Sequence, residues 1–110
     1  MTQKELYQQE IEKITRIIRD KYQPEKIILY GSAARGDLHQ DSDIDMLIIK
    51  DSDKPRRQRI RDISRLFIDD MYRVPFSPFV LTRAEFDKGK QEGRYIIRQI
   101  LKDGKVLYEA

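Results

Sequence analysis

Two aspartates one residue apart are the part of this sequence best suited to chemistry. Asp43 and Asp45 lie immediately before the apolar run 46–49, which has the length and composition of a buried strand. Because side chains alternate along a strand, both carboxylates are expected on one face and Ile44 on the other. Two carboxylates on one face repel each other unless a cation lies between them, and a divalent cation suits such oxygen ligands.

A Gly-Ser pair supplies a second chemical feature. Gly31 and Ser32 directly follow the apolar run 27–30, which also reads as a buried strand. Glycine lets the backbone approach a ligand closely, and serine can begin a helical turn whose free N–H groups suit a phosphate. A phosphate-binding turn near a cation-binding pair predicts nucleotide chemistry. The alternative is an ordinary loop with a capping serine and two solvated aspartates.

The stretch 29–49 resembles the minimal nucleotidyltransferases of the DNA polymerase beta superfamily, including their MntA-like antitoxin type. Their signature is Gly-Ser, ten residues and then Asp-x-Asp, and here ten residues separate Ser32 from Asp43. Arg35 and Gly36 in the loop, and Ser42 before the aspartates, match the fuller form of the signature. The resemblance implies a nucleotidyltransferase fold of the α/β or α+β class, with helices packed on a small mixed sheet of three to four strands.

The same resemblance implies a role for each signature residue. Gly31 and Ser32 would bind the phosphates of ATP or another NTP. Asp43 and Asp45 would hold Mg²⁺ and act as the catalytic carboxylates while an acceptor hydroxyl attacks the α-phosphorus. Arg35 would either reach a phosphate of the nucleotide or brace the loop against an acidic neighbour.

One position departs from the family pattern. Active members carry a third aspartate on the third strand, where it completes the metal site that activates the acceptor and serves as general base. Aligning Val74, Pro75 and Thr82 with that pattern puts Ser77 at the third-carboxylate position. Serine has neither the charge to hold a second cation nor useful basicity at neutral pH. The resemblance therefore leaves open whether this chain catalyses transfer.

Two functional interpretations follow, and a third is weaker. The first is a working Mg²⁺-dependent nucleotidyltransferase that moves AMP from ATP onto a hydroxyl of a protein or a small molecule. The second is a weakly active or inactive subunit that acts as antitoxin and binding partner of a HEPN-domain protein. The third is a nucleic-acid binder, which is disfavoured because Asp43 and Asp45 would repel phosphates without a metal.

The rest of the sequence predicts the elements that hold the signature. Thr2 and Glu5 fit a capping box at the start of a helix. The expected elements are a helix over 3–20, strands over 26–30 and 43–50, a helix after Pro55, a strand over 74–82, two helices after Thr82 and Gly93, and a short strand over 106–108. This alternation predicts helices packed on a sheet. The two prolines of the third strand indicate an edge or irregular position.

The helix after Pro55 combines an apolar side with a basic one. Its expected buried stripe consists of Ile60, Ile63, Phe67 and Met71. Arg57, Arg61 and Arg65 repeat at four-residue spacing on another side, which is either a solvated face or a surface for an anionic partner. No aromatic residue is interleaved to stack on bases, so a protein partner is preferred over nucleic acid.

Length and composition predict one nucleotidyltransferase domain over 1–110. The chain is 39% hydrophobic, which supports a folded core, and it carries a formal net charge of +3. No apolar run approaches the roughly 20 residues needed to cross a bilayer, and the N-terminus lacks the apolar segment of a signal peptide. The absence of cysteine fits a cytoplasmic protein. The oligomeric state, including a homo-oligomer, is left open.

Overall fold

The computed structural model describes residues 1–110. Five helices and four strands follow one another along the chain, alternating except where α5 directly follows α4. They are, in order, α1 (Gln3–Tyr22), β1 (Lys26–Tyr30), α2 (Ser32–Arg35), β2 (Ile44–Ile49), α3 (Arg56–Arg65), β3 (Phe76–Leu81), α4 (Arg83–Gln91), α5 (Tyr95–Asp103) and β4 (Lys105–Glu109). No helix combines the length and the apolar content needed to cross a membrane.

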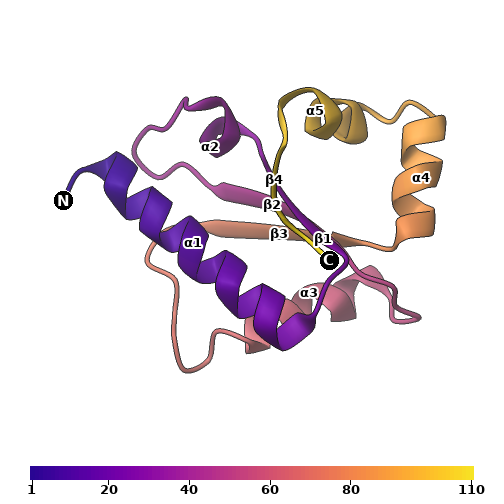
Figure 1. Ribbon diagram of the computed structural model, residues 1–110, viewed down its shortest axis with the longest axis horizontal. Coiled ribbons are helices and arrows are strands. Elements are labelled where there is room, and N and C mark those ends of the chain that lie inside the picture. Colours follow the sequence, from indigo (N-terminus) through magenta and orange to yellow (C-terminus); the bar gives the residue numbers. More distant parts are fainter.

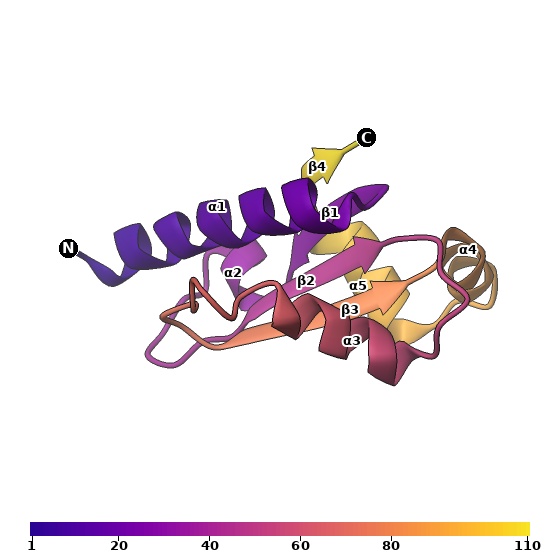
Figure 2. The same cartoon turned by 90° about the horizontal axis from the view of Figure 1, so that it is seen from below.

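The strands form one mixed sheet in the order β3-β2-β1-β4, which can be followed in Figure 2. Strand β1 pairs antiparallel with β2 and with β4, whereas β2 and β3 run parallel. Parallel neighbours need a crossover connection, and α3 supplies it. A four-stranded mixed sheet with packed helices confirms the fold class expected from the sequence.

Helices pack on both faces of this sheet (Figure 1). Apolar side chains of α1 and α3 form the larger core cluster with Met46 and Ile48 of β2. Apolar side chains of α4 and α5 form the second cluster with Leu47 and Ile49. Because side chains alternate along β2, Asp45 lies on the same face as this second cluster. Asp45 stays partly exposed at the start of the strand, outside the cluster.

Two helices begin at the capping boxes that their sequences contain. In α1 the Glu5 backbone N–H donates to Thr2 Oγ1 at 3.1 Å, and the Thr2 N–H donates to the Glu5 carboxylate at 3.3 Å. Thr82 and Glu85 make the same reciprocal pair at the start of α4. These bonds satisfy backbone groups that have no partner within the helix. Helix α1 runs to Tyr22, two residues past its expected end.

The buried side of α3 differs from the predicted stripe. The helix ends before Met71, which is 67% exposed, and Ile60 is 38% exposed. The buried positions are Arg59 and Ile63 in the helix and Phe67 just beyond its end, at successive four-residue intervals. The prediction was wrong at Ile60 because an arginine one residue earlier occupies the buried side of the first turn.

Arg59 can be buried because its guanidinium finds polar partners in three different segments. Its Nη1 lies 2.6 Å from Glu85 Oε1 and donates to the carbonyl of Val80 at 3.3 Å, and its Nε donates to the carbonyl of Lys54 at 2.8 Å. The ion pair fixes the start of α3 against the start of α4. The three arginines of the predicted row are all exposed on the outside of the helix: Arg57, Arg61 and Arg65.

Strand β3 is an edge strand, in agreement with its prolines. Pro78 lies within it and has no N–H to donate, which an edge position tolerates. The chain before β3 is held by α1, because the Arg73 backbone N–H donates to the carboxylate of Glu10. Glu10 is 1% exposed and also pairs with Lys13 at 3.2 Å. Helix α1 therefore positions the entry into β3.

Candidate active site

The Gly-Ser turn and the aspartate strand meet at one point. Gly31 follows β1 with a φ of 75° and precedes the short helix α2, which begins at Ser32 as expected. A β-carbon at Gly31 would lie only 2.5 Å from Oδ2 of Asp45. Glycine alone leaves room for the carboxylate and adopts this positive φ without strain. The backbone at the start of α2 therefore lies beside the Asp45 carboxylate.

The carboxylates of Asp43 and Asp45 influence each other. Burial and the negative charge of Asp43 raise the pKa of Asp45, and the positive charge of Arg35 opposes this rise. Asp43 is exposed and precedes β2, which starts at Ile44 rather than at residue 43. The net rise means that Arg35 does not fully offset the burial of Asp45 and its repulsion by Asp43. A bound cation would relieve this repulsion.

Ser77 lies next to Asp45 in the sheet. The parallel register of β2 and β3 makes these two residues partners, and the antiparallel register of β1 and β2 makes Tyr30 the partner of Asp45 on the other side. Side chains at partner positions project from the same face of a sheet. The exposed Ser77 side chain therefore lies beside Asp45, while its role at the third-carboxylate position stays a prediction.

Hydrogen bonds fix the segment that leads into Asp43. The Tyr7 hydroxyl of α1 donates to the carbonyl of Ser42 at 2.6 Å. The buried Ser42 hydroxyl accepts the His39 backbone N–H at 2.9 Å and lies 2.9 Å from Nδ1 of the His39 ring. These contacts hold Ser42 at the end of the loop in place. They thereby fix the backbone position of Asp43, the next residue.

Arg35 contacts two carboxylates at the end of α2. Its Nε lies 3.2 Å from Asp37 Oδ2, and its Nη1 lies 3.9 Å from Asp103 Oδ2 at the end of α5. Bracing against acidic neighbours is one of the two roles expected from the sequence. The side chain is 43% exposed, so the other role, a contact with a nucleotide phosphate, stays a prediction.

The donor set at this point suits one divalent cation. Asp43 and Asp45 offer the oxygen ligands that Mg²⁺ prefers, whereas Ser77 adds only a neutral hydroxyl. No group of three or more His, Cys, Asp or Glu side chains is placed to hold a metal ion. The site is also open to solvent, since Asp43 and Ser77 are exposed and Asp45 is partly exposed.

Two tyrosines near the site are not identified by the sequence pattern. Burial and the charge of Asp45 raise the pKa of Tyr30 to about 12, so its phenol stays protonated at neutral pH. Its position directly before Gly31, at the end of an apolar strand, is a signal that could have identified it. No local signal connects Tyr7 to Ser42, because 35 residues separate them.

Comparison with known proteins defines the family. The model of the polymerase beta nucleotidyltransferase family matches residues 12–110 of this chain. The chain belongs to this family. A putative protein adenylyltransferase of Methanocaldococcus jannaschii is 34% identical to it over 101 residues, which cover 89% of this chain and 94% of that protein.

Solved structures share the fold. A crystal structure of a mutant of the toxin–antitoxin MntA–HpeT has a TM-score of 0.60 at 22% identity, covering 90% of this chain and 72% of that chain. A crystal structure of a toxin–antitoxin with AMP-PNP has a TM-score of 0.57 at 19% identity, covering 90% of this chain and 73% of that chain. The arrangement of helices around the mixed sheet is therefore that of the nucleotidyltransferase fold.

Proposed function

We propose that this protein transfers AMP from ATP to a hydroxyl group of a partner protein in a reaction that depends on Mg²⁺. The proposal rests on the contact between Gly31 and Asp45, because it brings a phosphate-binding turn against a cation-binding carboxylate. The M. jannaschii relative carries the name of a putative protein adenylyltransferase, which supports AMP as the transferred group and a protein as the acceptor.

Each residue of the site has a separate role in binding the nucleotide or the cation. Backbone N–H groups at the start of α2, after Gly31, bind the triphosphate of ATP. Asp43 and Asp45 hold the cation, which when bound offsets the negative charge of the phosphates. Arg35 adds positive charge at the end of the same short helix. Tyr30, protonated at neutral pH, adds no negative charge beside the nucleotide.

The transfer forms one bond and breaks one. The acceptor oxygen bonds to the α-phosphorus, the bond from that phosphorus to the oxygen bridging to the β-phosphate breaks, and pyrophosphate leaves with the bonding electrons. The acceptor proton passes to water, because Ser77 offers no carboxylate at the place where the family carries its general base. We therefore expect transfer to be slow compared with a site that has a third aspartate.

The partner that we propose is a helical HEPN-domain protein in the cytoplasm, paired with this chain as toxin with antitoxin. Toxin–antitoxin proteins share the fold, and one of them was solved with AMP-PNP, which supports an adenine nucleotide and a protein partner together. The third interpretation, binding of nucleic acid, has no comparable support.

A second candidate function is favoured by Ser77. If the missing carboxylate abolishes transfer, the chain acts as an antitoxin by binding nucleotide and partner without chemistry. Pyrophosphate release from ATP with the purified partner distinguishes the two candidates. Release that accompanies labelling of the partner with AMP supports the enzyme, and nucleotide binding without release supports the inactive subunit.

Calorimetric titration of ATP, with and without Mg²⁺, tests the nucleotide site that both candidates share. The Asp43→Asn, Asp45→Asn variant is expected to lose the magnesium-dependent affinity while its melting temperature stays unchanged, because neither side chain belongs to the core clusters. The control is Asp51→Asn, Asp53→Asn, which alters an exposed pair of the same spacing. Unchanged affinity in the first variant would refute the proposal.

A further inference from the structure

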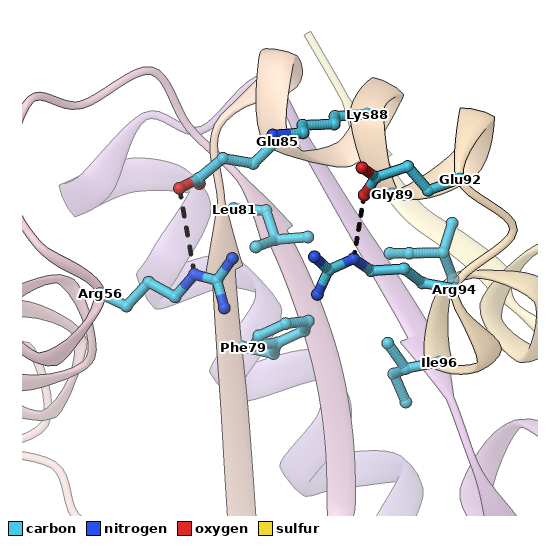
Figure 3. A pocket seen from close by; sticks show the side chains of 10 residues that line it. Arg56, Phe79, Leu81, Glu85, Lys88, Gly89, Glu92, Arg94 and Ile96 are labelled. Carbon is cyan, nitrogen blue, oxygen red and sulfur yellow. Dashed lines mark hydrogen bonds and ion pairs between the residues drawn. The ribbon is translucent and has the colours of Figure 1, made fainter.

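A cavity lies on the face of the sheet that carries Asp45. It has a volume of about 240 Å³ and opens between the start of α3, strand β3 and the pair α4–α5 (Figure 3). Phe79, Leu81 and Ile96 provide apolar walls, and Arg56 and Arg94 enter from opposite sides. Figure 3 shows the two guanidinium groups pointing toward each other beside the Phe79 ring, and the Arg56 guanidinium lies 5.9 Å from the ring centroid.

The shape of the cavity depends on close packing of α4 and α5. Gly89 is buried in α4, and a β-carbon there would lie 3.0 Å from Cγ1 of Ile97. Residue 94 directly precedes α5, so its side chain starts from the short connection between the two helices. The connection allows Arg94 to reach over the cavity while pairing with Glu92 at 3.3 Å. The cavity is therefore bounded by packed helices rather than by mobile chain ends.

The cavity carries an excess of positive charge. Glu85 is bound most closely by the buried Arg59, at 2.6 Å, and Arg56 lies farther from it, at 3.9 Å. Glu92 pairs with Arg94, and Lys88 on the rim has no ion-pair partner within 4.0 Å. Among the residues that line the cavity, Arg56, Arg94 and Lys88 are positive, whereas Glu85 and Glu92 are negative. The charge of Glu85 is also offset by Arg59, which lies outside the lining. Guanidinium groups that converge in this way bind carboxylates and phosphates by charge-assisted hydrogen bonds.

The position of the cavity relative to the aspartates indicates which anion it receives. Gly31 follows β1, Asp45 lies on β2, and Phe79 lies on β3, so the phosphate-binding turn and the cavity are on opposite sides of the aspartate strand. Phe79 is two residues beyond Ser77 on the same face, a separation of about 7 Å along the strand. A peptide with its hydroxyl over Ser77 would place a residue about two positions away over the cavity.

We propose that this cavity binds an acidic side chain of the acceptor protein, two or three residues from the hydroxyl that receives AMP. The proposal rests on the proposed function, since it assigns the acceptor to the β3 side of the site and the nucleotide to the β1 side. Arg56 and Arg94 are positioning residues that hold the acceptor segment, and they do not contact the reacting phosphate.

A binding experiment with a defined probe tests the assignment without requiring catalysis. The probe is a fluorescein-labelled peptide, Gly-Asp-Gly-Ser-Gly-Asp-Gly, and its anisotropy is measured with the full chain and magnesium–AMP-PNP. The version with Asn in place of both Asp residues should bind about tenfold more weakly. Arg56→Gln, Arg94→Gln should weaken binding of the acidic peptide by a similar factor. The control Arg57→Gln, Arg61→Gln removes the same charge from exposed positions outside the cavity and should have less than about a twofold effect.

Three results would overturn the proposal: no binding of the acidic peptide to the wild-type chain, equal losses in both double variants, or a loss of AMP-PNP affinity in Arg56→Gln, Arg94→Gln. The second would indicate diffuse electrostatic attraction, and the third a nucleotide subsite. Melting curves of all variants establish that they fold. The variant Arg56→Lys, Arg94→Lys keeps the two positive charges but removes the planar guanidinium groups. If the peptide binds as expected while no pyrophosphate is released with the partner, the proposal of AMP transfer is refuted, whereas the proposal of a peptide-binding subsite is supported.

Discussion

Ser77 and Asp45 are direct partners in the parallel register of β3 and β2, so the two side chains project from the same face of the sheet. A carboxylate at position 77 would therefore lie beside Asp45, where it could share a cation with it. The polar group present there instead is a neutral hydroxyl. The backbone therefore has the geometry for a site with three carboxylates, but the third carboxylate is missing.

Ser77→Asp is expected to add a cation site and to accelerate transfer. A general base typically contributes about 100- to 10,000-fold, and a retrofitted carboxylate should recover only part of this. Pyrophosphate release from ATP, measured with the partner present, gives the rate, and a manganese titration gives the number of bound cations. Ser77→Asn introduces a side chain of nearly the same shape as aspartate but without its charge. This variant should leave the transfer rate and the number of bound cations unchanged. Strong wild-type activity that Ser77→Asp does not alter would mean that another carboxylate already acts as the base.

Gly31→Ala should abolish magnesium-dependent ATP binding. Its β-carbon would collide with the Asp45 carboxylate and force either the turn or the carboxylate to move. Gly36→Ala is a matched control, because Gly36 has a similar φ of 80° but a β-carbon there would meet no atom within 4 Å. Gly36→Ala should lose about 1 kcal/mol of stability from its left-handed backbone, and Gly31→Ala should lose more, because its ψ of −157° is adopted freely only by glycine. Only Gly31→Ala should lose nucleotide affinity. Equal losses of affinity in calorimetry would contradict the assigned contact.

Arg59→Ala should destabilise the fold, although it lies in an arginine-rich helix. The variant removes the closest partner of Glu85 and leaves that carboxylate near the sheet with less compensating charge. We expect a loss of about 2 kcal/mol, below the about 3–5 kcal/mol of a fully buried pair because Glu85 is partly exposed. Arg57→Ala, at an exposed position, should change the unfolding free energy by less than about 0.5 kcal/mol. Urea unfolding of both variants measures the difference.

Glu10 should make stability depend on pH in the acid range. Burial raises its pKa, but the hydrogen bond from the Arg73 N–H and the charge of Lys13 outweigh burial and lower it overall. A carboxyl group whose pKa is lower in the folded state stabilises the fold above its unfolded pKa of about 4.3. This contribution is lost as the pH falls through the folded value. Glu10→Gln should therefore cost about 1–3 kcal/mol at pH 7, and its deficit should shrink in acid.

The matched control for Glu10 is Glu12→Gln, at an exposed position of the same helix that makes no ion pair within 4.0 Å. Its unfolding free energy should stay within about 0.5 kcal/mol of the wild type across the same pH range. If the Glu10→Gln deficit were constant between pH 7 and pH 3, the ionised carboxylate would not be the source of the stabilisation.

The sequence predicts well what depends on neighbouring residues. The strand over 26–30 is confirmed at both ends, and the capping boxes at Thr2 and Thr82 begin helices as expected. These features follow from apolar runs, from strand alternation and from a side chain that bonds the backbone three residues later. The exposed, partly irregular entry to β3 also follows from its prolines.

Contacts between distant segments are the part that the sequence does not predict. Periodicity assigns Ile60 to the buried side of α3, yet the buried side passes through Arg59 because its partner Glu85 comes 26 residues later. Likewise, the link from Tyr7 to Ser42 positions the aspartate segment across 35 residues. In both cases a polar side chain is buried because of a partner that only the folded chain brings near.

The position of Asp45 within β2 also disfavours a shifted register between β2 and its neighbouring strands. Its neighbours Ile44 and Met46 are fully buried on the opposite face, and the strand is paired on both sides. A shift of β2 by one residue against its partners would turn every side chain to the other face. The carboxylate would then enter the apolar core beneath α1, where an unpaired charge is strongly disfavoured. The residue that makes the site chemically capable thus also penalises misaligned forms of the sheet during folding.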